Sequence, residues 1–323
     1  MKESENKKQK QEEKQTIVSN LQKAIVKFTD SVDGFIYPLI IPPIQSIDED
    51  ILFEIYPDLR KVGKQKKLHV LLYSYGGDAH TAFHIGRLLQ EYSSELSIYV
   101  LREAKSAATL ISCAADRIVF SEISELGPMD PQISRSDEPG RFSPLAIKHT
   151  FDLLHQQSEE GHSQIVKVLT DKLPDPLILG EHLKSLETGK DYLCKLMNSR
   201  MFSGDAEKAI QVSEKLVTGY PDHGYCIDFV EAKSIGLKVE KVEEKHEETI
   251  LEIMKSYKNV WDKFDFHLKK ARNAETVKDK DAQFKEAFDL YDDLKKLATE
   301  VIKHQQDKKT PPTPKRKTSK KKK

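Results

Sequence analysis

The sequence predicts an α/β protein with a mostly parallel sheet, followed by a helical extension at the C-terminal end. Short β-rich runs recur through the first 120 residues, and the segments between the later runs carry apolar residues at helical spacing. Strands that alternate with helices form parallel βαβ units, whose sheet is covered on both faces. From about residue 243, apolar residues recur every three or four positions among charged ones, which predicts long amphipathic helices.

The four predicted strands read FIYPLII, LHVLLYS, SIYVL and RIVF, and they begin at Phe35, Leu68, Ser97 and Arg117. Two apolar stripes at helical spacing separate the last three strands; they comprise Ile85, Leu88, Leu89 and Tyr92, and then Leu110, Ile111 and Ala114. Residues from about 145 to 220 are predicted to be helical, with a break at LPDPLILG because two prolines prevent a continuous helix. The stretch GYCIDFVEAKSIGLKVE then predicts a turn, a short helix and a strand.

We expect a central domain over residues 16–242 and a helical extension over residues 243–304, flanked by two terminal segments. Residues 1–15 are a charge-rich arm, and residues 305–323 are a basic tail interrupted by prolines. Both are expected to be disordered because they can bury too little apolar surface to fold. The apolar stripe of the extension, centred on Trp261, must pack on its own domain or on a neighbour. It therefore favours a homo-oligomer or a protein partner.

Composition limits the classes of function. Lys and Arg total 52, as do Asp and Glu, so no net charge draws the protein to nucleic acid and no specific nucleic-acid partner is expected. The absence of a long apolar run and of a signal-peptide pattern predicts a cytoplasmic protein with at most peripheral membrane contact. Three cysteines without CxxC spacing predict neither disulfides nor a zinc site. His80 and His84 lie four residues apart but lack an HExxH pattern, and no metal or other cofactor is expected.

Two consecutive strand-to-helix turns carry groups that can take part in a chemical reaction. The second predicted strand ends at Gly76 and Gly77, where backbone N–H groups unobstructed by Cβ atoms can hold an anion or an oxyanion. The third ends shortly before Ser106, which begins a helix in small-residue surroundings; a serine there is either an N-cap or a nucleophile. A turn with free N–H groups beside a turn with a hydroxyl favours nucleophilic chemistry.

Three stretches carry a resemblance: YSYGGDAHTAFHIGRLL, KSAATLISCAADRIVFSEISELGPMDPQI and HGYCIDFVEAKSIGLKV. Together they resemble the serine dehydrogenase proteinase family, which has the Clp/crotonase fold, a ββα superhelix, and is related to signal peptide peptidase A and the Clp protease proteolytic subunit. The similarity covers about residues 30–240. It implies a serine endopeptidase that acts on peptide or protein substrates.

The resemblance also implies roles for particular residues. Ser106 is the expected nucleophile, and the backbone amides at Gly76, Gly77 and Ala107 are the expected oxyanion hole. The family is thought to use serine, aspartate and histidine in that chain order, which Ser106, Asp130 and His223 satisfy. A serine hydroxyl needs a base to take its proton, and histidine, with an ordinary pKa of about 6.5, suits that task. A carboxylate at Asp130 then fixes the histidine tautomer.

Lys148, in PLAIKHTF, is the alternative base, because relatives of signal peptide peptidase A use a serine–lysine dyad. A lysine acts as a base only if burial lowers its ordinary pKa of about 10.4, and the apolar residues before Lys148 allow such burial. Lys105, next to the serine, is a candidate for orienting the loop or neutralising an oxyanion, and a plain surface charge is the alternative. Two other functions stay open: a crotonase-like acyl-CoA enzyme, which uses the same turns without a serine nucleophile, and a non-catalytic scaffold of the Clp fold.

Overall fold

The computed structural model describes residues 2–130, 133–134, 141–142, 144–173 and 176–309. Its main sheet has the strand order β1-β2-β3-β4-β8, and every neighbouring pair is parallel. The strands are β1 (Phe35–Ile40), β2 (Gln65–Ser74), β3 (Ser93–Ala104), β4 (Arg117–Phe120) and β8 (Val239–Lys241). A short strand, β5 (Glu125–Leu126), pairs with the end of β3. The α/β class with a mostly parallel sheet is confirmed.

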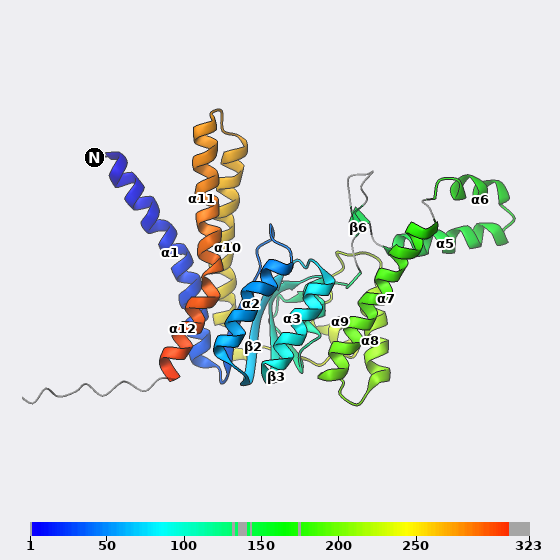
Figure 1. The fold of residues 1–323 in the computed structure, drawn as a ribbon, viewed down its shortest axis with the longest axis horizontal. Coiled ribbons are helices and arrows are strands. Elements are labelled where there is room, and N and C mark those ends of the chain that lie inside the picture. The colour runs from blue at the N-terminus through cyan, green and yellow to red at the C-terminus, as the bar shows by residue number, and fades with distance from the viewer. Residues whose placement is uncertain (1, 131–132, 135–140, 143, 174–175, 310–323) are drawn as a thin grey trace, which may run out of the picture.

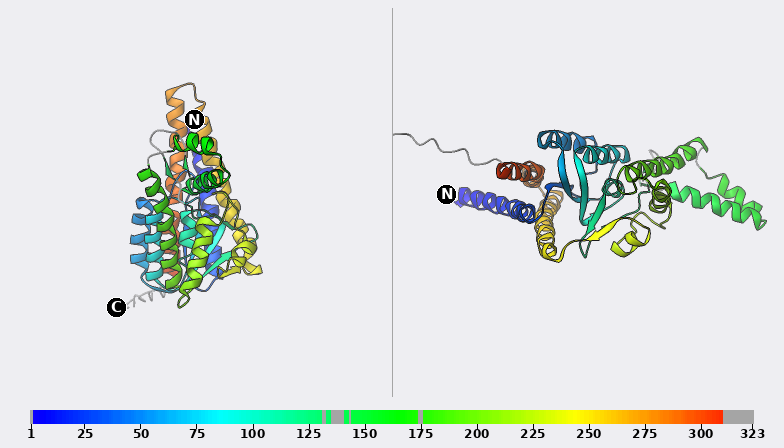
Figure 2. Two further views of the ribbon diagram at one scale, coloured as in Figure 1. Left: turned by 90° about the vertical axis from the view of Figure 1, so that its right-hand side faces the viewer. Right: turned by 90° about the horizontal axis from the view of Figure 1, so that it is seen from below.

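Helices cover both faces of this sheet (Figure 2). Packed against one face are α2 (Glu49–Val62), α3 (Ala79–Glu91), α4 (Ala107–Ser112), α7 (Pro176–Ser199) and α8 (Ala206–Thr218). Packed against the other face are α1 (Lys2–Ser31) and α10 (Glu244–Arg272), while α12 (Leu297–Lys309) lies along the β1 edge and contributes to both cores. Side chains alternate between the two cores along β2, where Leu72 joins the first and Leu71 the second.

Two pairs of helices project from the body in Figure 1. On one side, α5 (Pro144–Glu159) and α6 (Ser163–Thr170) form an arm connected to α7. The predicted break in the helical region is present, since α6 ends at Thr170 and α7 begins at Pro176. On the other side, α10 pairs with α11 (Val277–Lys295). The remaining elements are α9 (Phe229–Ser234) and the small hairpin of β6 (Ile133–Ser134) and β7 (Arg141–Phe142).

The apolar stripe of the C-terminal extension packs within its own chain. Ile250 and Tyr257 of α10 are buried against α1 and the sheet, and Phe264 is buried against α11. Trp261 stacks on Phe264 with ring centroids 5.1 Å apart. Of the two alternatives for this stripe, packing on its own domain is therefore the one observed. The stripe by itself no longer favours an oligomer.

The structure differs from both predicted terminal boundaries. Residues 2–15, expected to be a disordered arm, are the first half of α1, since Lys, Glu and Gln all favour helices and the second half of α1 is held by buried residues such as Leu21 and Phe28. At the other end, α12 continues to Lys309, past the expected start of the tail. Its Gln305 side chain donates to the backbone O of Ile36 and accepts from its N–H, both at 2.8 Å. The rest of the predicted tail lies outside the described residues.

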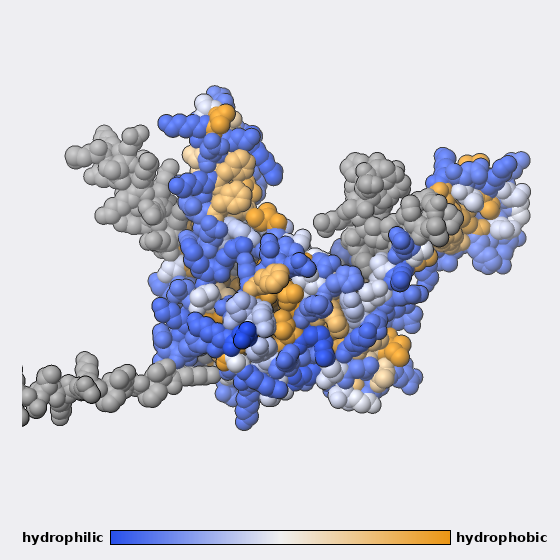
Figure 3. Space-filling model, viewed as in Figure 1, coloured by the Kyte–Doolittle hydropathy of each residue, from blue (hydrophilic) through white to orange (hydrophobic). Residues whose placement is uncertain are grey.

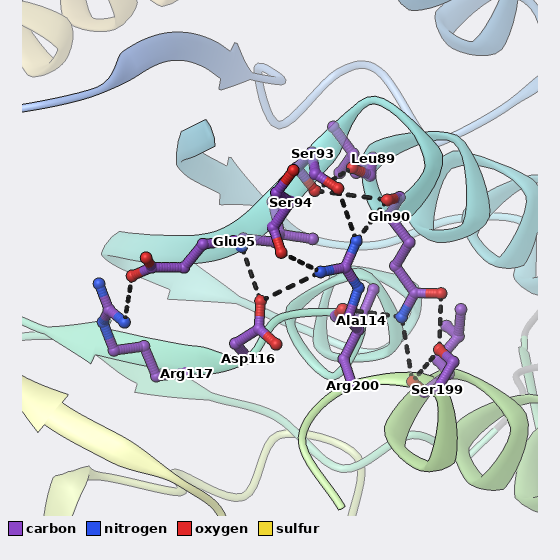
Figure 4. A network of polar contacts seen from close by, with 12 residues as sticks. Leu89, Gln90, Ser93, Ser94, Glu95, Ala114, Asp116, Arg117, Ser199 and Arg200 are labelled. Atoms are coloured by element: carbon purple, nitrogen blue, oxygen red, sulfur yellow. Dashed lines mark hydrogen bonds and ion pairs between the residues drawn. The ribbon is translucent and has the colours of Figure 1, made fainter. Parts of the chain in front are cut away.

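A polar cluster at the amino end of β3 anchors α7 to the sheet (Figure 4). The Arg200 guanidinium, just after α7, donates to the backbone oxygens of Gln90, Ser93 and Ser94 at 2.5 to 2.8 Å. It also lies 3.5 Å from the Asp116 carboxylate, which accepts from the backbone N–H of Leu96. The chain that continues from this anchor into α8 is thereby held close to the sheet.

Gln90 completes this amino-end cluster. Its side-chain amide donates to the backbone oxygens of Ala114, just after α4, and of Leu196, in α7. Its side-chain oxygen accepts from the Ser199 hydroxyl at 2.8 Å. One buried glutamine therefore joins α3, α4 and α7, and its polar atoms are hydrogen-bonded away from water.

Candidate active site

The turn between β3 and α4 holds Ser106 in an unusual backbone conformation. Its φ of 52° and ψ of −118° make it the one non-glycine residue with positive φ among the residues that the structure describes. Such a conformation is strained for a residue with a side chain and persists only where its surroundings enforce it. Lys105 N–H donates to the Ser74 oxygen at 3.0 Å, and Thr109 Oγ1 lies within 2.8 Å of the backbone oxygens of Ala104 and Gly127.

The Ser106 hydroxyl is half-buried and caps no helix. It makes no hydrogen bond to the first turn of α4 and none to any other residue in the described ranges, His223 included. Ser106 thus stands at the N-cap position of α4, where its backbone oxygen accepts from Thr109 N–H, but its side chain does not do the capping. The hydroxyl is available to an external group.

The glycine turn touches the serine turn. A Cβ atom on Gly76, whose φ is 100°, would lie 2.7 Å from the backbone oxygen of Lys105 and 2.9 Å from Ser106 Cβ. A Cβ on Gly77 would lie 2.3 Å from the backbone N and O of Ile47. Both positions therefore require glycine, because another part of the backbone lies too close to leave room for a Cβ atom. The two consecutive turns meet at the carboxyl end of the sheet, as their order along the chain predicted.

The three amides expected in the oxyanion hole are not equivalent. The N–H of Gly76 donates to the Ser74 hydroxyl at 3.0 Å, so it is already occupied. The N–H groups of Gly77 and Ala107 donate to no residue that the structure describes. These two free donors flank the serine turn, whereas Gly76 provides the space that lets the turns meet.

Asp130 and His223, 93 residues apart in sequence, form a hydrogen bond of 2.5 Å between Oδ1 and Nδ1. The aspartate side chain is 2% exposed and the histidine side chain is 32% exposed, so the carboxylate lies inside and the imidazole reaches the surface. A carboxylate at Nδ1 favours the tautomer with hydrogen on Nδ1, which leaves Nε2 as an acceptor. The structure thus brings together the aspartate and the histidine that the resemblance implied.

Backbone contacts explain why these distant residues meet. Asp130 follows β5, and His223 follows α8. Leu126 of β5 exchanges two backbone hydrogen bonds with Ile227, at 2.9 and 3.0 Å. The N–H of Met129 also donates to the oxygen of Leu216 in α8 at 2.9 Å. Because β5 itself pairs with the end of β3, the histidine segment is held to the same end of the sheet as the serine turn.

Lys148 lies elsewhere in the fold. It is exposed on α5, which packs against α6 and α7 and projects from the body (Figure 1). A lysine works as a base when burial lowers its pKa, and Lys148 lacks that burial in this chain. The geometry brings His223, and not Lys148, into contact with a carboxylate.

An ion-pair cluster that sequence reasoning missed lies beside Ser106. Glu125 of β5 pairs with Lys105, whose side chain is 11% exposed, and its other oxygen lies 2.8 Å from Nη1 of Arg102 and 3.1 Å from Sγ of Cys226. Burial alone would raise the pKa of Glu125, but the hydrogen bonds from Lys105, Arg102 and Cys226 outweigh it and lower that pKa to about 2. The carboxylate is therefore charged at neutral pH.

The two histidines with possible metal spacing have other surroundings. His80 Nδ1 lies 2.7 Å from the Tyr192 hydroxyl, and His84 lines a groove of about 700 Å³ between α2 and α3. This groove also holds Phe53, and Figure 3 shows apolar surface over the same two helices. Within the described part of the chain no group of three or more potential ligands could hold a metal ion. None of the candidate catalytic residues lines the groove.

In the part of the chain that the structure describes, no helix is long and apolar enough to cross a membrane.

Comparisons with known proteins place the chain in a family. Two uncharacterized proteins of Methanocaldococcus jannaschii are similar: MJ0137 is 27% identical over 67% of this chain and 68% of its own length, and MJ1495 is 24% identical over 58% and 56%. A solved variant of the 1510-N membrane-bound stomatin-specific protease aligns with a TM-score of 0.40 and 15% identity, over 70% of this chain and 85% of that one.

The family profile of ClpP-like SDH-type serine proteinases matches residues 35–266, which is more than half of the chain and includes both turns, β5 and the histidine segment. This match confirms the resemblance that the sequence motifs carried. The chain belongs to the family of ClpP-like SDH-type serine proteinases.

Proposed function

We propose that this protein is a serine endopeptidase in which Ser106 is the nucleophile and His223 the general base. The observation that carries this proposal is the Asp130–His223 hydrogen bond, formed at the end of the sheet where the strained serine turn also lies. A buried carboxylate on one imidazole nitrogen, with the other nitrogen free, is the arrangement that a serine hydrolase needs. The family match supports serine peptidase chemistry in general.

The proposed reaction proceeds through an acyl-enzyme. His223 Nε2 takes the proton of the Ser106 hydroxyl as Oγ attacks the peptide carbonyl carbon, and the N–H groups of Gly77 and Ala107 stabilise the oxyanion that forms. The C–N bond then breaks, and His223 returns the proton to the leaving amine. Water attacks the ester in the same way and releases the second peptide. Asp130 holds the imidazole in place and stabilises its charged form throughout.

Two features favour this proposal over the other functions that the fold supports. A crotonase-like acyl-CoA enzyme would use the two free N–H groups without a serine and would not require the Asp130–His223 pair. A non-catalytic scaffold would have no use for a strained serine, since strain of about 1–3 kcal/mol is a cost to stability. The strained Ser106 and the Asp130–His223 pair lie at the same end of the sheet, which supports peptide hydrolysis.

Labelling with a fluorophosphonate probe tests the proposal, because such probes react with activated serines whatever the natural substrate is. We expect the wild type to be labelled on Ser106 and Ser106→Ala to be unlabelled. Ser158→Ala, which removes an exposed hydroxyl from α5, is the matched control and should label like the wild type. Mass spectrometry of the labelled peptide identifies the site. Equal labelling of wild type and Ser106→Ala would remove Ser106 from the mechanism.

A further inference from the structure

We propose that Glu125 is a positioning residue that fixes the nucleophile turn against the histidine segment, an inference that rests on the proposed function above. Its two carboxylate oxygens contact three segments of the chain. Lys105 belongs to the serine turn, Arg102 to the end of β3, and Cys226 to the segment that carries His223. The side chains of Glu125 and Lys105 are only 14% and 11% exposed, so water competes little for the contact between these two.

The location of Glu125 makes it suited to this role. It stands at one end of a six-residue segment whose other end is Asp130, the partner of His223. This segment is held to β3 through Glu103 and Ala104 and to the histidine segment through Leu126 and Ile227. The backbone thus places the segment between nucleophile and base, and the Glu125 side chain adds direct contacts to both sides.

The protonation states of the partners suit these contacts. Cys226 is exposed as a residue, but partial burial of its thiol, together with the hydrogen bond to the charged Glu125, raises its pKa to about 11. Its sulfur therefore carries hydrogen at neutral pH and donates to Glu125 Oε2. Glu125 is charged under the same conditions, and Lys105 lies against it as its counter-ion. Three donors therefore converge on one carboxylate. Each donates a hydrogen bond, whose geometry is more specific than that of a general electrostatic attraction.

The stem of Lys105 is confined as well. A Cβ atom on Gly127 would lie 2.6 Å from Lys105 Cδ, so the lysine side chain fills the space that this glycine leaves. Removing the charge of Glu125 would leave a nearly buried ammonium without its counter-charge, which favours movement of the lysine toward water. Because Ser106 is the next residue, such movement shifts the nucleophile relative to its base.

The expected consequence is a loss of reactivity that exceeds the loss of stability. Displacing a reacting group by about 1 Å can slow a reaction roughly 100-fold, whereas an exchange of glutamate for glutamine keeps the shape of the side chain. A buried ion pair is in general a weak source of net stability compared with apolar packing, so geometry is the property that the Glu125 contacts are suited to supply.

The test measures how fast a fluorophosphonate probe labels Ser106 as a function of probe concentration, together with the melting temperature. We expect Glu125→Gln to lower the maximal labelling rate at least about tenfold, while the half-saturating probe concentration stays within about twofold of the wild type. Glu95→Gln is the matched control. Glu95 also pairs with an arginine, Arg117, at 2.7 Å, but at the opposite end of β3, and its maximal rate should equal that of the wild type.

A second pair of variants tests the contact to the histidine segment without removing the charge. Cys226→Ser keeps a donor to Glu125 and should label like the wild type, whereas Cys226→Ala removes the donor and should label about two- to fivefold more slowly, as loss of a single hydrogen bond allows. This pair also decides the matter if Glu125→Gln does not fold. Equal maximal rates for Cys226→Ala and Cys226→Ser would then overturn the inference.

The outcomes separate this inference from the proposed function. If the wild type does not react at Ser106, the proposed function fails. If the wild type reacts and Glu125→Gln reacts equally fast, only the positioning role of Glu125 is overturned. A rate that falls in Glu125→Gln and in Glu95→Gln in proportion to their melting temperatures would also overturn it, because that result describes general destabilisation.

Discussion

Two polar clusters lie at opposite ends of the sheet and differ in how completely their groups are hydrogen-bonded. In the amino-end cluster, Arg200 and Gln90 direct their side chains to backbone and side-chain acceptors of several elements (Figure 4). At the carboxyl end, the Ser106 hydroxyl and the N–H groups of Gly77 and Ala107 have no partner in the described ranges, and the backbone of Ser106 is strained.

We propose that this difference separates a structural cluster from a reactive one. Buried polar groups in proteins are almost always hydrogen-bonded, so a cluster that meets this requirement contributes to stability and leaves nothing for a ligand. Free donors and a strained residue lower stability and are found where a ligand or a transition state completes the contacts. The comparison predicts that substitutions at the carboxyl end change rate and that substitutions at the amino end change stability.

The largest expected effect is on rate, at the carboxyl end. His223→Ala removes the proposed base, and Asp130→Asn leaves it in the wrong tautomer; each should lower the maximal turnover of a cleaved peptide by about 10³- to 10⁴-fold. Lys148→Ala should retain wild-type turnover, because Lys148 is exposed on the projecting α5. Steady-state kinetics on the three variants decides between the two bases. Loss of activity in Lys148→Ala with full activity in His223→Ala would reverse the assignment.

The next effect is on stability, at the amino end. Arg200→Met removes three hydrogen bonds to backbone oxygens, including those of Gln90 and Ser93, and should lower the free energy of unfolding by about 3 kcal/mol. Turnover per folded molecule should be unchanged. Urea unfolding measures the first quantity and kinetics at low temperature the second.

Arg117→Met provides the comparison for Arg200→Met. Arg117 pairs with Glu95 and Glu240, which are more exposed, so its loss should lower the free energy of unfolding by less than about 1 kcal/mol. Two results would show that the division between a structural and a reactive cluster is wrong. One is that Arg200→Met lowers the free energy of unfolding no more than Arg117→Met does, and the other is that Arg200→Met lowers turnover per folded molecule.

What the sequence could predict follows from how local each signal is. The strands and the two turns depend on short apolar runs, on Gly76 and Gly77, and on a serine at a helix start, all of which are visible within a few residues. The sequence does not reveal the helix at the N-terminus, because its polar first half resembles a disordered arm and the apolar residues that hold it, such as Phe28, are buried only against distant elements.

The candidate site shows the same limit. Asp130 and His223 were identified through motif order, but their hydrogen bond depends on the pairing of Leu126 with Ile227, which no local pattern reveals. Glu125 was missed for the same reason: its partners come from three segments, and in sequence it is one glutamate among many. The sequence leaves Lys148 open as a base, because its burial depends on where α5 lies in space.

The smallest expected effect concerns the strain at Ser106 itself. Alanine at this position keeps a Cβ atom and so keeps the strain of φ at 52°, whereas glycine adopts positive φ without strain. Relief of roughly 1–3 kcal/mol of strain exceeds the entropy cost of glycine, about 0.5–1 kcal/mol, so Ser106→Gly should be more stable than Ser106→Ala by about 1 kcal/mol. Both variants lack the hydroxyl and should be inactive, which separates stability from chemistry.

Thermal unfolding of the two proteins side by side measures the difference. A Ser106→Gly protein less stable than Ser106→Ala would mean that the serine turn stores no strain, and that the free hydroxyl and N–H groups alone distinguish the carboxyl end of the sheet from the amino end.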